Sequence, residues 1–516
     1  MPGELLTPPA AAATRERALA ELAGRRFDLL VVGGGIIGAG IANEAARAGL
    51  AVALVDRRDF GAATSTASSK LIHGGLRYLR LGDVRLVREA HRERRVLLRT
   101  VAPHLVRRLP FLLPLYEHGP YRPAVVQAGL WTYSTIARER LGGLAPPERA
   151  RRSVPDLRLE GLRGCGVYAD ASTHDGRLCL ANVAAAAAAG ATVLNYAEVT
   201  ELHRGGGRVC GAQVRDGIGG STLSVEARAV VNATGPWLDR LRRLEDPGAE
   251  PYGQLSKGVH VLLPLEFPWS AALAIPHDKA RVTFAYSWQG MLLLGTTDEP
   301  YAGDPDDVAV TEHDVATVLA EAAVAVDPEV LRADRIRAAF AGLRVLPASP
   351  GGPVSARRET AFLIGAGGML TVAGGKLTTY RRIALDALRR LAPALGLGRL
   401  DEDPVPLPGA ADLAAVAGRL ARHPAGLDAA TRSYLAHLYG GLAPDVLAEA
   451  DADPALLEPL HPHGPDLGAQ VAYAVRHEWA TSAEDVVRRR TTLWWRGLAT
   501  PEVVAKVERL LAAAPG

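Results

Sequence analysis

Residues 27–38 read FDLLVVGGGIIG, in which a short apolar run passes directly into a glycine turn. The run is too short for a buried helix and suits a parallel strand that is covered on both faces. Within the turn, Gly33 permits the tight reversal and Gly35 lets the backbone approach a pyrophosphate. Gly38 lets the following helix pack closely on the strand. The stretch therefore predicts the strand, turn and helix of a dinucleotide-binding unit.

The residues that follow supply the context that this motif requires. A helix is expected over residues 39–48 because Gly49 is a typical helix-ending residue. A second apolar strand is expected over residues 52–55, and Asp56 ends it, roughly 20 residues beyond the middle glycine, where a ribose-binding carboxylate belongs. An acid at this position favours a free 2′-hydroxyl, as in FAD or NAD. The alternative, a glycine-rich loop without a ligand, would not need this carboxylate.

A second motif indicates which dinucleotide is bound. Residues 68–79 read SSKLIHGGLRYL and follow a hydroxyl-rich loop. This segment resembles the flavin-proximal segment of the FAD-dependent glycerol-3-phosphate dehydrogenases, whose motif stands here unbroken. The resemblance extends from about residue 27 to the C-terminus and implies that the cofactor is FAD.

The resemblance also implies the architecture. It implies an α/β fold of the two-domain FAD-binding type (Rossmann-like, as in glutathione reductase and the amino-acid oxidases), with a mixed-sheet substrate cap and a C-terminal helical domain. The expected boundaries are a tail over 1–26, an oxidoreductase domain over 27–400 and a helical domain over 401–516. Within the oxidoreductase domain, the FAD-binding segments are 27–82, 165–245 and 350–400, and the cap segments are 83–164 and 246–349.

The cofactor contacts are expected at four places along the chain. Two are the glycine turn with its acid and the flavin-proximal motif, and a third is the Ala-Thr-Gly that follows the apolar strand near residue 231. The fourth opens a helix at residue 374, whose unpaired N–H groups would point at the flavin. The expected residues are Gly33, Gly35, Gly38, Asp56, Ser68, Ser69, Lys70, His73, Gly74, Thr234, Gly235, Gly374, Gly375, Lys376 and Leu377.

The substrate implied by the resemblance is glycerol 3-phosphate, a small dianion that needs cations for its phosphate and a proton acceptor near its C2 hydroxyl. Among the residues that the resemblance implies for the site, Arg344 and Arg357 are the expected phosphate clamps, because arginine grips phosphate through two hydrogen bonds. His260 is the expected proton acceptor, and Lys376 would orient the alcoholate or balance the charge of the reduced flavin. Supporting substrate contacts are expected from Arg77, Tyr78 and Thr379. A surface salt bridge for each arginine and a satisfied strand histidine remain the ordinary alternatives.

Three activities are compatible with these residues. The first is a dehydrogenase that passes electrons from the flavin to a membrane quinone. The second is an oxidase of the same fold that makes hydrogen peroxide. The third is a non-catalytic flavin-binding protein, which would not need the arginine cluster.

Composition limits the partners and the location. The 516 residues carry a formal net charge of +3, too small for a field that would favour nucleic acid. The three cysteines lack metal-ligand spacing, so no metal is expected. No apolar segment is long enough to span a membrane, and residues 1–26 do not form a signal peptide. The expected location is cytoplasmic, with peripheral attachment to the cytoplasmic face of the inner membrane, and a homodimer is left open.

The basic segment 83–100 carries two interpretations. It has apolar residues at helical spacing with six arginines around them: Arg85, Arg88, Arg92, Arg94, Arg95 and Arg99. Such a helix can lie on anionic lipid. The more common reason for a run of charges is a solvated helix face, here balanced in part by Glu89 and Glu93.

Overall fold

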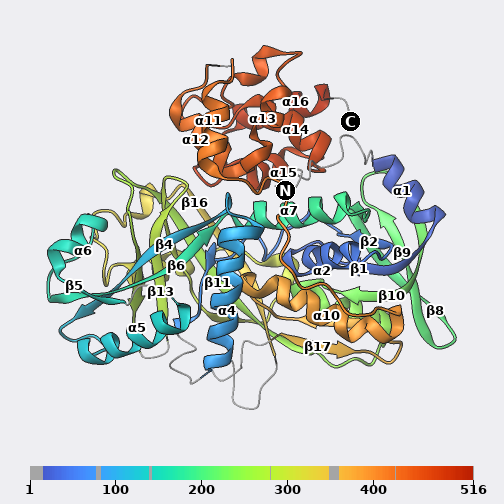
Figure 1. Cartoon of the computed structure of the whole chain (residues 1–516), viewed down its shortest axis with the longest axis horizontal. Helices are drawn as coiled ribbons and strands as arrows, with labels where there is room; N and C mark the ends of the chain where they lie inside the picture. The colour runs from blue at the N-terminus through green and yellow to red at the C-terminus, as the bar shows by residue number, and fades with distance from the viewer. Residues whose placement is uncertain are drawn as a thin grey trace.

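Two β-sheets and a helical region make up the part of the chain that the computed structural model describes, residues 15–76, 83–138, 142–278, 281–347, 360–424 and 426–514 (Figure 1). The sheets lie side by side, and the helical region covers one edge of both, at the top of the view. The predicted fold class, a Rossmann-like FAD-binding fold with a mixed-sheet cap and a helical C-terminal region, is confirmed.

The first sheet is built on the apolar run of the opening stretch, which forms β1 (Arg26–Val32). Its strands follow the order β17-β18-β10-β1-β2-β7, and β1 pairs in parallel with both β2 and β10. The parallel core reflects strands whose apolar residues are buried on both faces. The other strands are β2 (Val52–Val55), β7 (Thr192–Leu194), β8 (Ala197–Gly205), β9 (Arg208–Asp216), β10 (Thr222–Asn232), β17 (Ala361–Ile364) and β18 (Leu370–Ala373).

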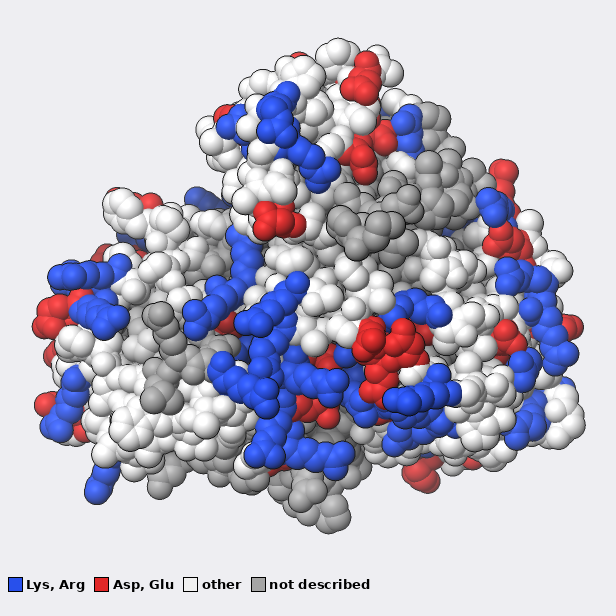
Figure 2. Space-filling model, in the orientation of Figure 1, with Lys and Arg blue, Asp and Glu red and all other residues white. Residues whose placement is uncertain are grey.

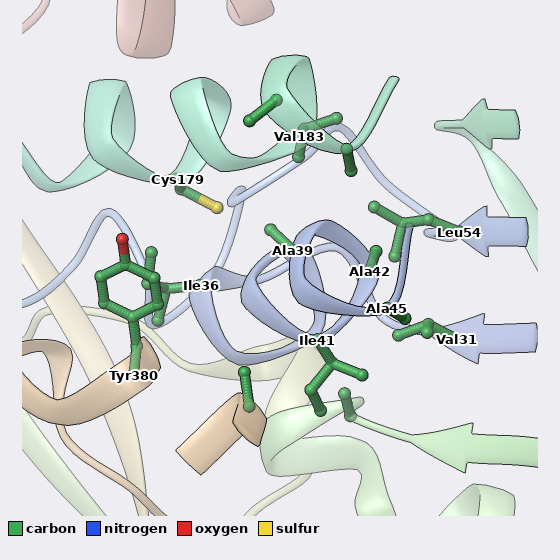
Figure 3. Close-up of a cluster of buried hydrophobic side chains, with 14 of the residues drawn as sticks. Val31, Ile36, Ala39, Ile41, Ala42, Ala45, Leu54, Cys179, Val183 and Tyr380 are labelled. Carbon is green, nitrogen blue, oxygen red and sulfur yellow. The ribbon is translucent and has the colours of Figure 1, made fainter. Parts of the chain in front are cut away.

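Alternate residues of β1 face two different cores. Leu29 and Val31 face a layer of three helices, in which α2 (Ile36–Arg47) lies between α7 (Asp175–Ala188) and α10 (Tyr380–Leu395) (Figure 3). Leu30 and Val32 face β8, β9 and the N-terminal helix α1 (Arg15–Gly24). Because Ala18 and Leu22 of α1 are buried in this second core, the helical part of the predicted tail packs into the folded domain.

The second sheet forms the cap, in the order β15-β11-β14-β13-β12-β4-β6-β3, with β16 paired to β11 and β5 to β6. Most neighbours are antiparallel, whereas β12 pairs in parallel with β4, so the cap sheet is mixed. Its strands are β3 (Leu71–Ile72), β4 (Val106–Tyr116), β5 (Gly143–Ala145), β6 (Leu162–Thr173), β11 (Gly253–Pro264), β12 (Ala272–Pro276), β13 (Val282–Trp288), β14 (Met291–Gly295), β15 (Glu299–Tyr301) and β16 (Ala338–Pro347).

Helices cover both faces of the cap sheet. One core includes residues of α6 (Pro147–Ser153) and α9 (Glu312–Ala322), and the other includes residues of α5 (Pro123–Ala137). Of the remaining helices before the C-terminal region, α4 spans Val84–Val96 and α8 spans Leu238–Glu245.

The basic segment forms α4, followed by the π-helical turn Leu97–Val101. Arg94 was predicted among its surface arginines, and this prediction is wrong: the side chain is buried and forms an ion pair with Asp170. Glu93 is also buried, where it pairs with Arg381 of α10. The exposed arginines of the segment are Arg85, Arg88, Arg92 and Arg99.

The helical region contains α11 (Leu413–Ala421), α12 (Ala429–Tyr439), α13 (Ala443–Ala448), α14 (Gly468–His477), α15 (Ala483–Asp485) and α16 (Pro501–Ala513). Buried charges tie it to the first sheet, because Arg489 and Arg490 both pair with Asp59. An aromatic side chain ties it to the cap, because Trp495 belongs to a core made largely of cap residues. Within the described ranges, no helix combines the length and the apolar character needed to cross a membrane.

Candidate active site

A cavity of about 1180 Å³ lies between the two sheets, and both sheets contribute to its walls. It extends from the glycine turn after β1 to the strands β11 and β16 of the cap. Most of the residues predicted for the site line it: Gly33, Gly35, Asp56, Ser68, Ser69, His73, Thr234, Gly235, His260, Arg344, Gly374, Gly375, Lys376 and Leu377.

The glycine turn has the close backbone approach that the motif requires. Gly33 has a φ of +106°, and a Cβ there would lie 2.6 Å from the carbonyl oxygen of Ala233. Gly38 does not line the cavity, but a Cβ on it would overlap the carbonyl oxygen of Gly33. Glycine is therefore needed at Gly38 so that α2 can pack against the turn, which is the role predicted for it.

Asp56 lines the cavity at the end of β2. Its carboxylate accepts hydrogen bonds from the backbone N–H of Gly34 at 2.6 Å and of Arg58 at 2.8 Å. Burial raises the pKa of Asp56 to about 6 in spite of these two bonds. The carboxylate thus braces the turn and stands where a ribose hydroxyl would donate to it.

His260 lies on β11 at the opposite end of the cavity. Its Nε2 is 2.9 Å from Ser69 Oγ, and its ring stacks on Phe340 with 4.9 Å between centroids. Its Nδ1 has no hydrogen-bond partner among the described residues. Burial, together with the charges of Arg344 and Lys70, holds the pKa of His260 well below its ordinary value. The imidazole is therefore neutral near pH 7 and able to accept a proton.

Arg344 reaches the cavity from β16, where it pairs across the sheet with Ser256 of β11. Its guanidinium donates to Asp298 at 3.0 Å and to Thr296 Oγ1 at 2.8 Å. The guanidinium lies over Gly258, two residues before His260, where a Cβ would collide with it. The absence of a side chain at Gly258 therefore lets Arg344 lie along the strand towards His260.

Besides Gly38, three predicted residues lie away from the cavity wall. Lys70, predicted as a cofactor contact, is fully buried, pairs with Asp175 and does not line the cavity. The N–H of Gly74 donates to Asp170, and the neighbouring Gly75 lines the cavity instead. Thr379 is buried behind the wall. Arg77, Tyr78 and Arg357 lie outside the described residues.

The segment after β18 differs from the expected helix start at residue 374. A 3₁₀ turn spans Leu377–Thr379, and α10 begins only at Tyr380. Successive residues of a 3₁₀ turn point about a third of a turn apart. Thr378 therefore lines the cavity where Thr379 was predicted, and its hydroxyl accepts from the N–H of His73 at 3.2 Å.

Some residues of the site were missed in the sequence. Gly258 carries no local motif, because its role follows from the pairing of β11 with β16. Trp237 lies two residues beyond the predicted Ala-Thr-Gly segment, and the guanidiniums of Arg57 and Arg58 stack on its ring at 4.5 and 5.2 Å from the centroid. Both arginines follow Asp56, so their position beside the acid was the available signal.

Comparison with known proteins gives the same family for most of the chain. Residues 28–381 match the family model described as FAD dependent oxidoreductase, and residues 403–516 match the C-terminal domain of alpha-glycerophosphate oxidase. Glycerol-3-phosphate dehydrogenase 2 of Mycobacterium tuberculosis is 37% identical over 505 residues, covering 94% of this chain and 84% of that protein. The glycerol-3-phosphate dehydrogenase of Pseudomonas aeruginosa is 38% identical over 484 residues, covering 90% and 92%.

The chain belongs to the FAD-dependent glycerol-3-phosphate dehydrogenase family. A solved structure, the glycerol-3-phosphate dehydrogenase of Bacillus halodurans complexed with FAD, superposes with a TM-score of 0.77 at 27% identity and covers 98% of this chain and 97% of that one. FAD is the cofactor of this family member, and the cavity fits it. The glycine turn leaves space for a pyrophosphate, Asp56 lines the cavity where the motif predicts a ribose-binding carboxylate, and the cavity continues to His260.

Proposed function

We propose that this dehydrogenase-family enzyme oxidises sn-glycerol 3-phosphate to dihydroxyacetone phosphate. The observation that carries the proposal is that one cavity joins the dinucleotide turn to a neutral histidine and an arginine. The names of the relatives in Mycobacterium and Pseudomonas support the choice of substrate. A non-catalytic flavin-binding protein would need neither His260 nor Arg344 at the end of the cavity.

The reaction requires the C2 alcohol to give up a proton and a hydride. FAD, when bound, supplies the acceptor for the hydride. We assign the proton to His260, whose lowered pKa keeps the ring neutral before substrate binds. A dianionic substrate beside the ring would raise that pKa again, because an opposite charge favours the protonated form. The imidazole would thus become a stronger base when the substrate is in place.

The phosphate is assigned to Arg344, whose planar guanidinium can form two parallel hydrogen bonds to it. In the structure this side chain is already oriented by Asp298 and Thr296. Arg357, Arg77 and Tyr78 remain predicted partners in the same role. Lys376 lines the cavity, and we assign it the orientation of the alcoholate.

Anaerobic addition of glycerol 3-phosphate to the purified FAD-bound protein tests this function directly. Loss of the oxidised-flavin absorbance is the expected result, and glycerol at the same concentration should leave the spectrum nearly unchanged. A spectrum that does not respond to glycerol 3-phosphate would refute the proposed substrate.

We propose a membrane quinone as the final electron acceptor. The oxidase alternative stays open because the matched C-terminal family is described by the name of an oxidase. Under air, the dehydrogenase should form far less than one hydrogen peroxide per substrate and should reduce a soluble quinone analogue rapidly. One peroxide per substrate, with slow quinone reduction, would favour the oxidase.

We further propose a cytoplasmic, peripheral location on the inner membrane, with the basic face of α4 as the contact. Figure 2 shows lysine and arginine side chains gathered along the position of α4. Replacement of Arg85, Arg88 and Arg92 by alanine should weaken binding to anionic vesicles, and binding by the wild type should weaken as salt rises. The matched control removes three exposed arginines of α6: Arg149, Arg151 and Arg152. Equal binding by both triple variants would refute the role of α4.

A further inference from the structure

A buried ammonium group lies in an aromatic cage beside the active site. Lys70 and its ion-pair partner Asp175 are both 0% exposed. Lys70 Nζ lies 4.8 Å from the ring centroid of Trp288, 5.2 Å from that of Phe340 and 4.0 Å from that of Trp495. The first two rings come from the cap sheet and the third from the helical region. Three rings from two parts of the fold, the cap sheet and the helical region, therefore enclose one charge.

Stability alone does not account for this arrangement. Burial lowers the pKa of Lys70, and the attraction of Asp175 offsets only part of that effect. Buried ion pairs can often be replaced by apolar residues without loss of stability. Lys70 also has a φ of +53°, a left-handed conformation that a residue with a side chain adopts only when its surroundings impose it. The ammonium instead fixes the backbone at this position.

The backbone fixed by Lys70 carries the residue that contacts His260. Lys70 Nζ donates to Asp175 and to the carbonyl of Thr66, each at 2.8 Å. The Lys70 N–H donates to Ser68 Oγ at 2.9 Å, and that hydroxyl donates to Asp175 at 2.7 Å. These bonds fix the chain on both sides of Ser69.

Ser69 is held from the cap as well. The hydroxyl of Tyr286 donates to the Ser69 carbonyl at 2.9 Å, and Ser69 Oγ lies 2.9 Å from His260 Nε2. Phe340 links the two groups, because its ring stacks on His260 and also forms part of the aromatic cage around the Lys70 ammonium. The imidazole is thus oriented by a serine whose own position depends on the caged lysine.

We propose that Lys70 is a positioning residue that fixes Ser69, so that the Ser69 hydroxyl accepts a hydrogen bond from Nε2–H of His260. Nδ1, a buried nitrogen with no partner among the described residues, then carries the lone pair of the neutral ring. This assignment rests on the proposed function for its catalytic consequence. The tautomer itself is a property of the protein without substrate.

The test compares Lys70→Met with Lys257→Met in the FAD-bound protein. Lys257 is a matched control because its ammonium also pairs with a buried carboxylate, Asp314, at 2.8 Å. It lies three residues before His260 on β11 and so points to the opposite face of the strand.

Lys70→Met should slow flavin reduction by saturating glycerol 3-phosphate about tenfold to a hundredfold, because small displacements of a reacting group have effects of this size. The substrate Kd and FAD content should change little. Lys257→Met should reduce its flavin at the wild-type rate.

Nitrogen-15 NMR of histidine-labelled protein gives a readout without turnover. The wild type should show the Nε2–H tautomer at His260, and Ser69→Ala and Lys70→Met should both give a mixture. A His260→Asn sample identifies the signal. Wild-type His260 protonated on Nδ1, or an unchanged tautomer in both variants, would overturn the proposal. If glycerol 3-phosphate fails to reduce wild-type flavin, the proposed function fails while this result still stands.

A double-mutant cycle separates positioning from general damage. If Lys70 acts through Ser69, the variant carrying both Ser69→Ala and Lys70→Met should be no slower than the worse single variant. Additive losses would overturn the proposed relay. Should Lys70→Met fail to fold, Ser69→Ala still tests the relay, since it removes the hydroxyl that contacts His260 and leaves the ion pair of Lys70 and Asp175 in place. Lys70→Arg should retain most of the rate because it keeps the charge within the cage.

Discussion

The two ends of the cavity are built in different ways. The dinucleotide end comes largely from one continuous segment, in which β1, the glycine turn, α2, β2 and Asp56 follow one another. The substrate end combines Ser69, His260 and Arg344 from distant segments, and its geometry depends on the pairing of β11 with β16. A local motif therefore specifies the first end, whereas tertiary packing specifies the second.

The largest effect is expected at the dinucleotide end. Gly38→Ala should abolish FAD binding or folding, because its Cβ would overlap the Gly33 carbonyl oxygen and neither backbone can move without breaking the turn. A loss of more than about 3 kcal/mol in binding free energy would weaken FAD affinity more than a hundredfold. Flavin content measures the loss of FAD binding, and thermal unfolding measures the loss of stability. Gly398→Ala is the control, since nothing lies within 4 Å of its Cβ position. Full FAD content in Gly38→Ala would show that the turn tolerates more than its geometry suggests.

A smaller effect, confined to catalysis, is expected at the substrate end. Arg344→Ala should lower kcat/KM by about tenfold to a hundredfold, since a hydrogen bond to a charged group contributes roughly 1.5–3 kcal/mol. FAD content should remain unchanged, and Arg344→Lys should recover only part of the loss. Arg357→Ala should behave in the same way if the predicted clamp is right. Arg332→Ala, which removes an exposed guanidinium paired with Asp334, should change nothing.

Glycerol distinguishes a phosphate clamp from general damage. Glycerol lacks the phosphate, so its slow oxidation should be nearly the same in wild type and Arg344→Ala. An equal loss with both substrates would mean that Arg344 supports the cavity rather than the phosphate.

The same contrast explains what the sequence could reveal. β2 begins and ends at the predicted residues, and the glycine turn has its predicted geometry, because each depends on neighbours close in the chain. Thr379 was predicted one residue away from the threonine that lines the cavity, because sequence does not distinguish a 3₁₀ turn from the first turn of a helix.

Lys70 shows the limit most clearly. It belongs to a motif that resembles a cofactor-binding segment, yet its ammonium is enclosed by Trp288, Phe340 and Trp495. These rings are distant from Lys70 and from one another in the chain, with no spacing that would have linked them. His260 and Arg344 were predicted through a family resemblance. The position of the Arg344 guanidinium over Gly258, near His260, depends on the pairing of β11 with β16 and could not be predicted from the sequence.

A modest effect is expected where the cap meets the dinucleotide end at the surface. Asp306, in the turn before α9, pairs with Arg57, Arg58 and Arg240 beside the dinucleotide end. Burial alone would raise its pKa, but hydrogen bonds from Arg57 and Arg240 hold the pKa of Asp306 at about 2. Because this pKa is depressed, ionised Asp306 contributes to folding stability above about pH 4, and the contribution is lost as the pH falls towards 2.

Asp306→Asn should therefore lower stability at pH 7 by at most about 1 kcal/mol, because the pair is partly exposed and screened by solvent. Thermal unfolding at low and high salt measures this change, which should shrink as salt rises. Asp334→Asn is the control on an exposed pair elsewhere. A large, salt-independent loss would show that the cap and the dinucleotide end depend on one another more than these exposed pairs suggest.

The smallest effect concerns the pH dependence of the substrate end. Burial, Arg344 and Lys70 lower the pKa of His260, so the ring should remain neutral as the pH falls below 6.5. The substrate phosphate also titrates near pH 6. Dividing the kcat/KM profile of wild type by that of His260→Gln removes the substrate contribution and leaves that of His260.

This ratio should change by less than about twofold between roughly pH 7.5 and 5.5. A histidine with an ordinary pKa would instead lose about tenfold over the same range, because it would be mostly protonated at the lower pH. Because the pKa of His260 is lowered, the ring loses its neutral form, and kcat/KM falls, only at more acidic pH. In Lys70→Met, removal of one positive charge should raise the pKa of His260 and move the loss back towards neutrality. A tenfold fall already present in the wild type would mean that the buried, cation-flanked environment of His260 does not control its protonation.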